Sequence, residues 1–389
     1  MSSFFFFFLR LHIVILIGIP LLTLYGMFTT PLQGKTLVLG AIFYFLTGFG
    51  ITGGYHRLWS HRAWNAITPV RFIVLMCGAA AMQGSARWWC RNHRAHHKFT
   101  DTSKDPYNVR KGFFYAHFGW MMFKQDPKDV GRADIEDLNN DSMIVFQHNY
   151  YGFIAVFVSI ILPTLIAGFG WGDFAGGYFY AALARIVLVH HATFFVNSLA
   201  HYLGDQAYSD LHTAFDSVIT ALLTLGEGYH NYHHEFPQDY RNGIKWFHYD
   251  PTKWTITFLY HLGLAYDLKW IQDNEITKAK LQVQQSRLQA KRNRITYGKN
   301  LDQNLPEYTS EQIASLSDAK QVMVAIEGKV YDVTEFADLH PGGRDTLMAH
   351  KGKDITQLFN GDTGEHIHSR HAREILVRYI VGRLADSHK

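Results

Sequence analysis

The sequence predicts a mainly α-helical membrane protein with four transmembrane helices, a histidine-rich cytosolic domain and a small α+β domain near the C-terminal end. Three observations lead to this prediction. Four apolar runs are each about 20 residues long, which is enough to cross a bilayer. The spacing H-x-x-H-H occurs twice, and beyond about residue 270 the chain becomes polar and charged.

The apolar runs are the candidate transmembrane helices. No basic region precedes the first run, so we interpret it as a span and not as a signal peptide. A shorter apolar segment at residues 70–86 would, if it crossed, put His56 and His93 on opposite sides of the membrane. We therefore expect an interfacial or protein-buried helix there. The four expected spans are Phe4–Phe28, Thr36–Tyr55, Tyr151–Phe169 and Phe174–Val196.

Charge sets the expected orientation and excludes some functions. Residues 57–150 contain thirteen Lys and Arg, against Lys35 alone in the first loop between spans. The positive-inside rule places that segment and both termini in the cytosol. Two cysteines, Cys77 and Cys90, exclude a disulfide framework and fit a reducing compartment. No long basic block interleaved with aromatic residues suggests nucleic-acid binding.

Histidines are the most informative residues of the chain. Histidines three or four positions apart project from one face of a helix, and clustered neutral imidazoles usually bind metal. One such cluster is equally well a hydrogen-bonded patch, but the repetition favours metal. Nine histidines suit two ions with four or five each, and imidazole accepts zinc, copper, nickel or iron. The nine are His56, His61, His93, His96, His97, His201, His230, His233 and His234.

The polar C-terminal part divides into two pieces. Residues 271–304 have the composition of a solvated linker helix, and residues 305–386 form the small α+β domain. Within it, the spacing of Thr309 and Gln312 predicts a capping box, and "VMVAIEGKVYDV" predicts a hairpin across Glu327-Gly328. A haem bound by His340 in "DLHPGGRD" and by a second histidine downstream would have a six-coordinate iron with no vacant site. Such a haem carries electrons and does not bind oxygen. Such a carrier favours a redox-active metal pair over zinc.

Two parts of the chain resemble known families. Residues 50–270 resemble membrane acyl-CoA desaturases of the stearoyl-CoA delta-9 type through "HRLWSH", "HRAHH", "NSLAH" and "GEGYHNYHHEFP". Residues 305–386 resemble cytochrome b5 through "GKVYDVTEF", "HPGG" and "HSRHAREI". The order of the two parts and "EFPQDYRNGIKWFHYDPTKW" are similar to the fungal enzymes. Residues 1–270 are thus expected to be the desaturase domain.

The resemblance implies roles for individual residues. It assigns the nine histidines as metal ligands, Asn197 as a ligand through water, and Arg91 and Lys124 to the coenzyme A phosphates. It places Gln83, Trp89 and Thr193 near the bend of an acyl tunnel. This chain departs from the pattern at Asn92, where many relatives have Asp, and at His190 and His191, whose role is open.

The second haem ligand depends on which way the residues are counted. Counting forward from His340 suggests His366, and counting back through "SRHAREILVRYIVGRL" suggests His368. We expect His340 and His368 as axial ligands, because the helix after the second ligand must keep its register.

The implied function is an O2-dependent acyl-CoA desaturase of the endoplasmic reticulum membrane. It would use two Fe ions and haem b, take electrons through an NADH-cytochrome b5 reductase type donor, and act on the 9,10 bond of palmitoyl- or stearoyl-CoA. The alternatives are a hydroxylase, a desaturase of other regiospecificity, a zinc hydrolase, or an electron carrier with an inactive desaturase domain. Chain-length preference and oligomeric state stay open, with Tyr44, Phe45 and Phe49 as candidates to close the tunnel.

Overall fold

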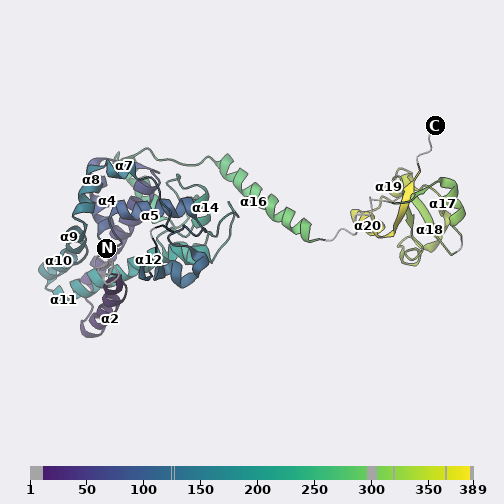
Figure 1. Ribbon diagram of the computed structural model, residues 1–389. Helices are drawn as coiled ribbons and strands as arrows, with labels where there is room; N and C mark the ends of the chain where they lie inside the picture. Colours follow the sequence, from purple (N-terminus) through teal and green to yellow (C-terminus); the bar gives the residue numbers. More distant parts are fainter. Residues whose placement is uncertain are drawn as a thin grey trace. The chain divides into compact units, whose positions relative to one another are not determined.

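The computed structural model describes residues 12–123, 125–126, 128–295, 305–318, 320–363 and 366–385. The chain divides into two compact units, Met1–Ser286 and Arg287–Lys389. Helices make up most of the first unit, and the second is a small α+β unit, as the sequence predicts (Figure 1).

The prediction of four transmembrane helices is wrong for the described chain, in which three helices are long and apolar enough to cross a bilayer. The expected first span begins within residues 1–11, which lie outside the described residues. Its described part, Val14–Thr29, rises about 24 Å, less than the roughly 30 Å of a hydrocarbon core. The three candidate spans are Gly34–Ser60, Tyr151–Trp171 and Phe174–His201.

The spans are built from helices of alternating α and π geometry. Gly172 in the left-handed conformation ends the second span, and Asp173 begins the third by accepting from the backbone N–H of Gly176 at 2.9 Å. Asp173 also accepts from Thr36 at the start of the first span, and its backbone N–H donates to the carbonyl of Ala167 in the second span at 3.1 Å, so this one residue links all three. The α-helices of the three spans are α3 (Gly34–Phe49), α9 (Tyr151–Val156), α10 (Leu162–Trp171), α11 (Phe174–Gly176) and α12 (Arg185–Asn197), and α2 (Ile19–Thr29) precedes them.

The segment between the first two spans folds against the first span. Its apolar helix α4 is too short to cross a bilayer. A Cβ on Gly50 would lie 2.2 Å from the backbone N of Gly78, so the two helices touch through glycine. The helices here are α4 (Thr68–Ala79), α5 (Ala86–Phe99), α6 (Trp120–Met122), α7 (Glu136–Asn139) and α8 (Ser142–Asn149).

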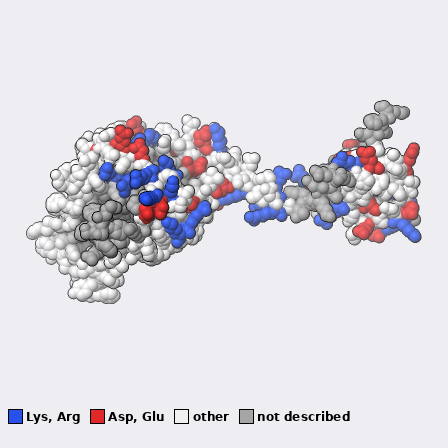
Figure 2. Space-filling view, viewed as in Figure 1, with Lys and Arg blue, Asp and Glu red and all other residues white. Residues whose placement is uncertain are grey.

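The chain after the third span completes the first unit. Buried Tyr55, Trp64, Leu75, Cys90 and Ile256 join this part to the first span in one core. Charged side chains gather over the part containing α5, α7 and α14, whereas the end around α2, α10 and α11 has almost none (Figure 2). The elements are α13 (Val218–Leu223), α14 (His230–Glu235), α15 (Pro251–His261) and a two-stranded pair of β1 (Asn65–Ala66) with β2 (Ala265–Tyr266).

Helix α16 (Asp273–Arg294) covers most of the predicted linker. Its first part is more than a solvated helix, because Ile276, Ala279 and Val283 are buried. Ser286 donates to Asp210 of the first unit at 2.7 Å. Residues 273–286 therefore pack as part of the first unit.

The second unit contains a four-stranded sheet in the order β3-β6-β5-β4. The hairpin is confirmed, with Ile326 opposite Lys329 and positive φ angles at Glu327 and Gly328. The Thr309–Gln312 capping box is also confirmed. The elements are β3 (Glu307–Tyr308), α17 (Ser310–Leu316), β4 (Met323–Ile326), β5 (Lys329–Asp332), α18 (Arg344–Ala349), α19 (Thr356–Asn360), α20 (Arg370–Leu376) and β6 (Ile380–Leu384).

Candidate functional site

The end of the first span brings two histidines together through its helical geometry. Residues Gly50–Ser60 form a π-helix, and the N–H of His61 donates to the carbonyl of His56 at 3.1 Å. In an α-helix, residues five apart would point about 140° away from each other. The wider turn instead places the two rings 4.9 Å apart, centroid to centroid.

Helices α5 and α14 supply six histidines. Ser85 begins α5 by accepting from the N–H of Trp88, and the last two turns of the helix carry His93, His96 and His97. The six-residue helix α14 carries His230, His233 and His234. His201 ends the third span in a single 3₁₀ turn. Every predicted histidine thus lies at a helix end that meets the others.

The structure brings all nine predicted histidines into two groups of potential ligands. Within each group, one ring nitrogen from every histidine lies within 4.8 Å of all the others. The five-histidine group contains His56, His61, His93, His97 and His233, and the four-histidine group contains His96, His201, His230 and His234.

The spacing of the nitrogens suits metal ions. The Nε2 atoms of His56 and His233 are 2.9 Å apart, and those of His61 and His93 are 2.8 Å apart. In the other group, the Nε2 of His230 lies 3.2 Å from that of His201 and 3.0 Å from that of His234. Two imidazoles bound to one ion at about 2.1 Å and at right angles would be about 3 Å apart. The donor set therefore fits one ion in each group.

The protonation of these histidines agrees with that reading. Burial, followed by the charges of neighbouring histidines, lowers the pKa values of His61, His93, His97, His230, His233 and His234 well below the ordinary value. The imidazoles are therefore neutral at physiological pH and present lone pairs. The Nε2 of His96 is buried and has no hydrogen-bond partner among the described residues, as a metal-binding nitrogen would.

Two buried carboxylates contact the histidine groups, and neither was predicted from the sequence. Glu227 accepts from the Nδ1 of His56 at 2.8 Å, and Asp105 accepts from the Nδ1 of His96 at 2.9 Å. Arg57, fully buried beside His56, pairs with Glu227 and Asp250. Arg57 lies inside "HRLWSH" and Glu227 inside "GEGYHNYHH". A charged residue within a histidine motif could therefore have indicated a group that contacts the ligands.

Two cavities meet at the histidines. One, of about 390 Å³, is lined by Gln83, Trp89, His93, Thr193 and Asn197 among others. The second, of about 40 Å³, shares Trp89, His93, Thr193 and Asn197 with the first. Gln83 donates to Thr193 at 2.9 Å. The predicted tunnel residues therefore lie where the two cavities adjoin the metal groups, and Asn197 lies there as well.

The remaining predicted positions lie outside the two metal groups or outside the described residues. Arg91 is exposed on α5, Asn92 beside it is buried, and Lys124 lies outside the described residues. His190 contacts the carbonyl of Ala81 through Nε2 at 2.9 Å, and His191 contacts His117 at 3.0 Å. Neither histidine belongs to a metal group, but His190 lines the cavity of about 390 Å³.

The second unit contains a cavity of about 440 Å³ between His340 and His368. Their rings are nearly parallel with centroids 6.2 Å apart. Two imidazoles on opposite sides of one iron would have centroids roughly 6 Å apart. The Nδ1 of His368 contacts the carbonyl of Phe359 at 3.1 Å, which leaves Nε2 for the cavity. His366 also borders the cavity, but its side chain is exposed. This pocket fits a haem better through His368 than through His366.

The chain matches the family model for fatty acid desaturases over residues 35–270 and that for the cytochrome b5-like heme/steroid binding domain over residues 309–385. It is 50% identical to a probable acyl-CoA desaturase of Schizosaccharomyces pombe, over 93% of this chain and 74% of that protein. It is 41% identical to acyl-CoA desaturase 1 of Saccharomyces cerevisiae, over 97% of this chain and 74% of that protein. Human stearoyl-CoA desaturase is 38% identical, over 66% of this chain and 73% of that protein.

Among solved structures, cytochrome b558 of Ectothiorhodospira vacuolata is 33% identical over 21% of this chain and all of that chain, with a TM-score of 0.20.

Proposed function

The chain belongs to the fatty acid desaturase family, and from that premise we propose that it is a membrane acyl-CoA delta-9 desaturase that receives electrons from its own cytochrome b5-like domain. The observation that carries the proposal is the arrangement of nine histidines in two groups beside a cavity lined mostly by apolar atoms. This combination suits oxidation of a saturated chain, which offers no polar handle at the reacting carbons.

The metal centre of this proposal is a pair of irons. The five-histidine group would hold one ion, and the four-histidine group would hold the other with Asn197 reached through water. Iron is favoured over zinc because the fused haem domain delivers electrons, and a zinc hydrolase needs none. With two irons bound, the site would supply the O2-activating chemistry that removes two hydrogens from adjacent methylenes. The overall reaction takes up O2, two electrons and two protons and releases two waters.

Regiochemistry must come from the protein, because neighbouring methylenes are chemically alike. The cavities next to His93 would hold the acyl chain bent, with one pair of carbons facing the metals. Gln83, Trp89 and Thr193 would form the bend, where Gln83 and Thr193 are hydrogen-bonded. Arg91 and Lys124 would bind the coenzyme A phosphates outside it. The proposed substrates are palmitoyl- and stearoyl-CoA, desaturated at the 9,10 bond.

The second unit would carry electrons on haem b between His340 and His368. Six-coordinate haem transfers electrons without binding oxygen, so it does not compete with the metal pair. The proposed donor to this haem is a reductase of the NADH-cytochrome b5 reductase type. The proposed location is the endoplasmic reticulum membrane, with the C-terminal end and the metal groups on the cytosolic side, where Lys and Arg gather between the first two of the three spans.

Expression of the chain in a cell that lacks its own desaturase tests this function. We expect palmitoleic and oleic acids to accumulate, with the double bond located between carbons 9 and 10 by mass spectrometry. Hydroxylated acids would favour a hydroxylase, and a double bond elsewhere would favour another regiospecificity. A haem-loaded chain that yields no product would support the carrier with an inactive desaturase domain. Zinc in place of iron in the purified chain would support the hydrolase.

A further inference from the structure

We propose that Glu227 and Asp105 are positioning residues, each holding one histidine of one metal group in the tautomer and orientation that binds metal. The proposal rests on the metal centre proposed above and goes beyond its ligand set. Among the nine histidines, all of them within the described residues, the ion pairs with carboxylates are those of His56 and His96. One belongs to the five-histidine group and the other to the four-histidine group.

The geometry at His56 fixes the proton of its ring. A carboxylate only accepts hydrogen bonds, so the Nδ1 atom that lies 2.8 Å from the Oε2 of Glu227 must carry the hydrogen. The opposite nitrogen, Nε2, lies 2.9 Å from the Nε2 of His233 and is left with its lone pair. Glu227 thus selects the tautomer whose free nitrogen faces the five-histidine group. It also makes that nitrogen more basic.

Glu227 itself is held ionised in a buried site. Its Oε1 accepts from Arg57 at 2.8 Å, and its Oε2 accepts from the side-chain amide of Asn242 at 2.8 Å. These two donors fix the carboxylate in place, and the buried guanidinium of Arg57 compensates its charge.

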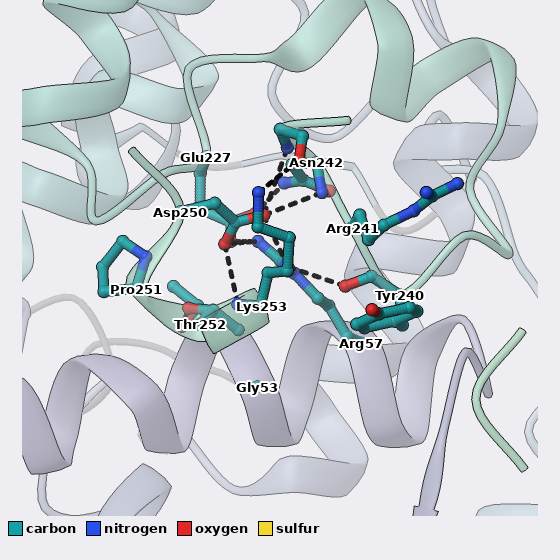
Figure 3. A network of polar contacts seen from close by, with 12 residues as sticks. Gly53, Arg57, Glu227, Tyr240, Arg241, Asn242, Asp250, Pro251, Thr252 and Lys253 are labelled. Atoms are coloured by element: carbon teal, nitrogen blue, oxygen red, sulfur yellow. Dashed lines mark hydrogen bonds and ion pairs between the residues drawn. The ribbon is translucent and has the colours of Figure 1, made fainter. Parts of the chain in front are cut away.

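Arg57 is in turn held by Asp250 and Tyr240, neither of which contacts any of the nine histidines. It donates to both oxygens of Asp250, at 3.0 and 2.9 Å, and to the carbonyl of Tyr240 at 2.7 Å. Figure 3 shows Arg57 extending from the first span between Asp250, Asn242 and the backbone of Tyr240. Asp250 therefore shares the ionic network with Glu227 but makes no contact with a histidine ligand. This makes Asp250 a matched control.

The four-histidine group has its own carboxylate from a different part of the chain. The Oδ1 of Asp105 accepts from the Nδ1 of His96 at 2.9 Å and from the N–H of Tyr107 at 3.0 Å. Its Oδ2 accepts from the N–H of Asp101 at 3.1 Å. The opposite nitrogen of His96 is buried without a hydrogen-bond partner among the described residues, and it points into the group. The same arrangement thus recurs at the second metal position, built from backbone amides in place of arginine.

The test measures binding of Fe²⁺ alone to the full-length, metal-free chain under anaerobic conditions, with ions counted per chain. Glu227→Gln and Asp105→Asn keep the side-chain shape but lose the charge. Each variant should lower the affinity for one of the two ions by about 10- to 100-fold and leave the affinity for the other ion unchanged. The two variants should alter different components of the iron Mössbauer spectrum. Asp250→Asn should keep both ions within a few-fold of wild-type affinity.

The proposal is overturned if Glu227→Gln and Asp105→Asn bind both ions as tightly as the wild type. It is also overturned if Asp250→Asn weakens iron binding as much as Glu227→Gln, because Glu227 would then act only by balancing Arg57. If Asp250→Asn does not fold, Asp239→Asn replaces it, since Asp239 is a buried carboxylate bound to Arg241 and Tyr232. A wild-type chain that binds two ions but forms no monoene would instead reject the proposed function and leave this inference standing.

Discussion

The Nε2 atoms of His56 and His233 lie 2.9 Å apart, although 177 residues separate the two histidines in the sequence. The contact joins the end of the first span to α14 and places a ligand from each in the five-histidine group. Because both rings are buried, loss of either one leaves a gap that the other ligands in the group do not fill.

Substitution of His233 by Ala should therefore remove one ion from the chain and reduce monoene formation below detection. The haem absorption spectrum should stay unchanged, because the haem ligands belong to the other unit. Metal analysis, product analysis and visible spectroscopy on one preparation check all three points. His261→Ala is the matched control, since His261 is exposed at the end of α15. If His233→Ala still makes monoene at the wild-type rate, His233 is not a ligand.

The haem pocket predicts opposite results for two neighbouring histidines. His368→Ala should lose the six-coordinate haem spectrum, since this ring faces His340 across the cavity. His366→Ala should keep that spectrum, because its side chain is exposed. Visible spectra of the reduced and oxidised proteins distinguish them, and the reverse pattern would move the second ligand to His366. A separately added cytochrome b5 should restore part of the turnover in His368→Ala, since the metal groups are untouched.

The hydrogen bond from Gln83 to Thr193 predicts an effect on substrate position without an effect on the metals. Thr193→Val keeps the shape of the side chain and removes the acceptor of this bond. We expect kcat to fall by about tenfold, because a small displacement of the reacting carbons is costly. Iron and haem content should not change. Thr164→Val is the control, since Thr164 bonds within its own helix. Unchanged kcat in Thr193→Val would remove Thr193 from the substrate path.

Asp137 should stabilise the first unit in a pH-dependent way. Burial by itself raises the pKa of Asp137, but hydrogen bonds and charges from Arg94 and Arg62 outweigh burial and lower it to about 2. A lowered carboxyl pKa gives stability that is present above the ordinary value of 3.8 and is lost as pH falls towards 2. Since Asp137 is about one-third exposed, we expect its ion pairs to contribute roughly 1 kcal/mol to the free energy of unfolding at pH 7.

Thermal unfolding of Asp137→Asn against the wild type checks this dependence. The difference in stability should be constant from pH 7 to about pH 5 and should shrink as pH falls further. Arg94 lies on α5 between His93 and His96, so the ion pair also holds the helix that carries these ligands. A difference that does not depend on pH would show that the charge of Asp137 is not the source of the stabilisation.

The six histidines of α5 and α14 were predictable because helical spacing puts residues three and four apart on one face. Their division between two groups was not. His96 and His97 are adjacent in sequence, yet they belong to different groups, and so do His233 and His234. Adjacent residues of a helix point about 100° apart, so two sites can share one helix. Deciding which histidine goes to which site requires knowing how α5, α14 and the first span approach one another.

The carboxylates were missed for a similar reason. Asp105 lies nine residues after His96 in a loop, and Glu227 lies 170 residues after Arg57. No local spacing rule connects such residues. Four spans were predicted and three lie within the described residues, because the apolar run of residues 4–28 begins outside them and its described helix, Val14–Thr29, is short. The hairpin and the capping box, in contrast, depend on neighbouring residues and were predicted correctly.

The most direct test of the proposed function is a single-turnover experiment on the purified full-length chain with stearoyl-CoA and O2, after anaerobic reduction by at least two electrons per chain, with iron counted per chain. The account predicts two irons beside the haem and oleoyl-CoA with its double bond between carbons 9 and 10. It also predicts that product disappears in His233→Ala while the haem is still reduced. A chain that holds two irons and a reducible haem but returns stearoyl-CoA unchanged, or hydroxylated, would contradict it.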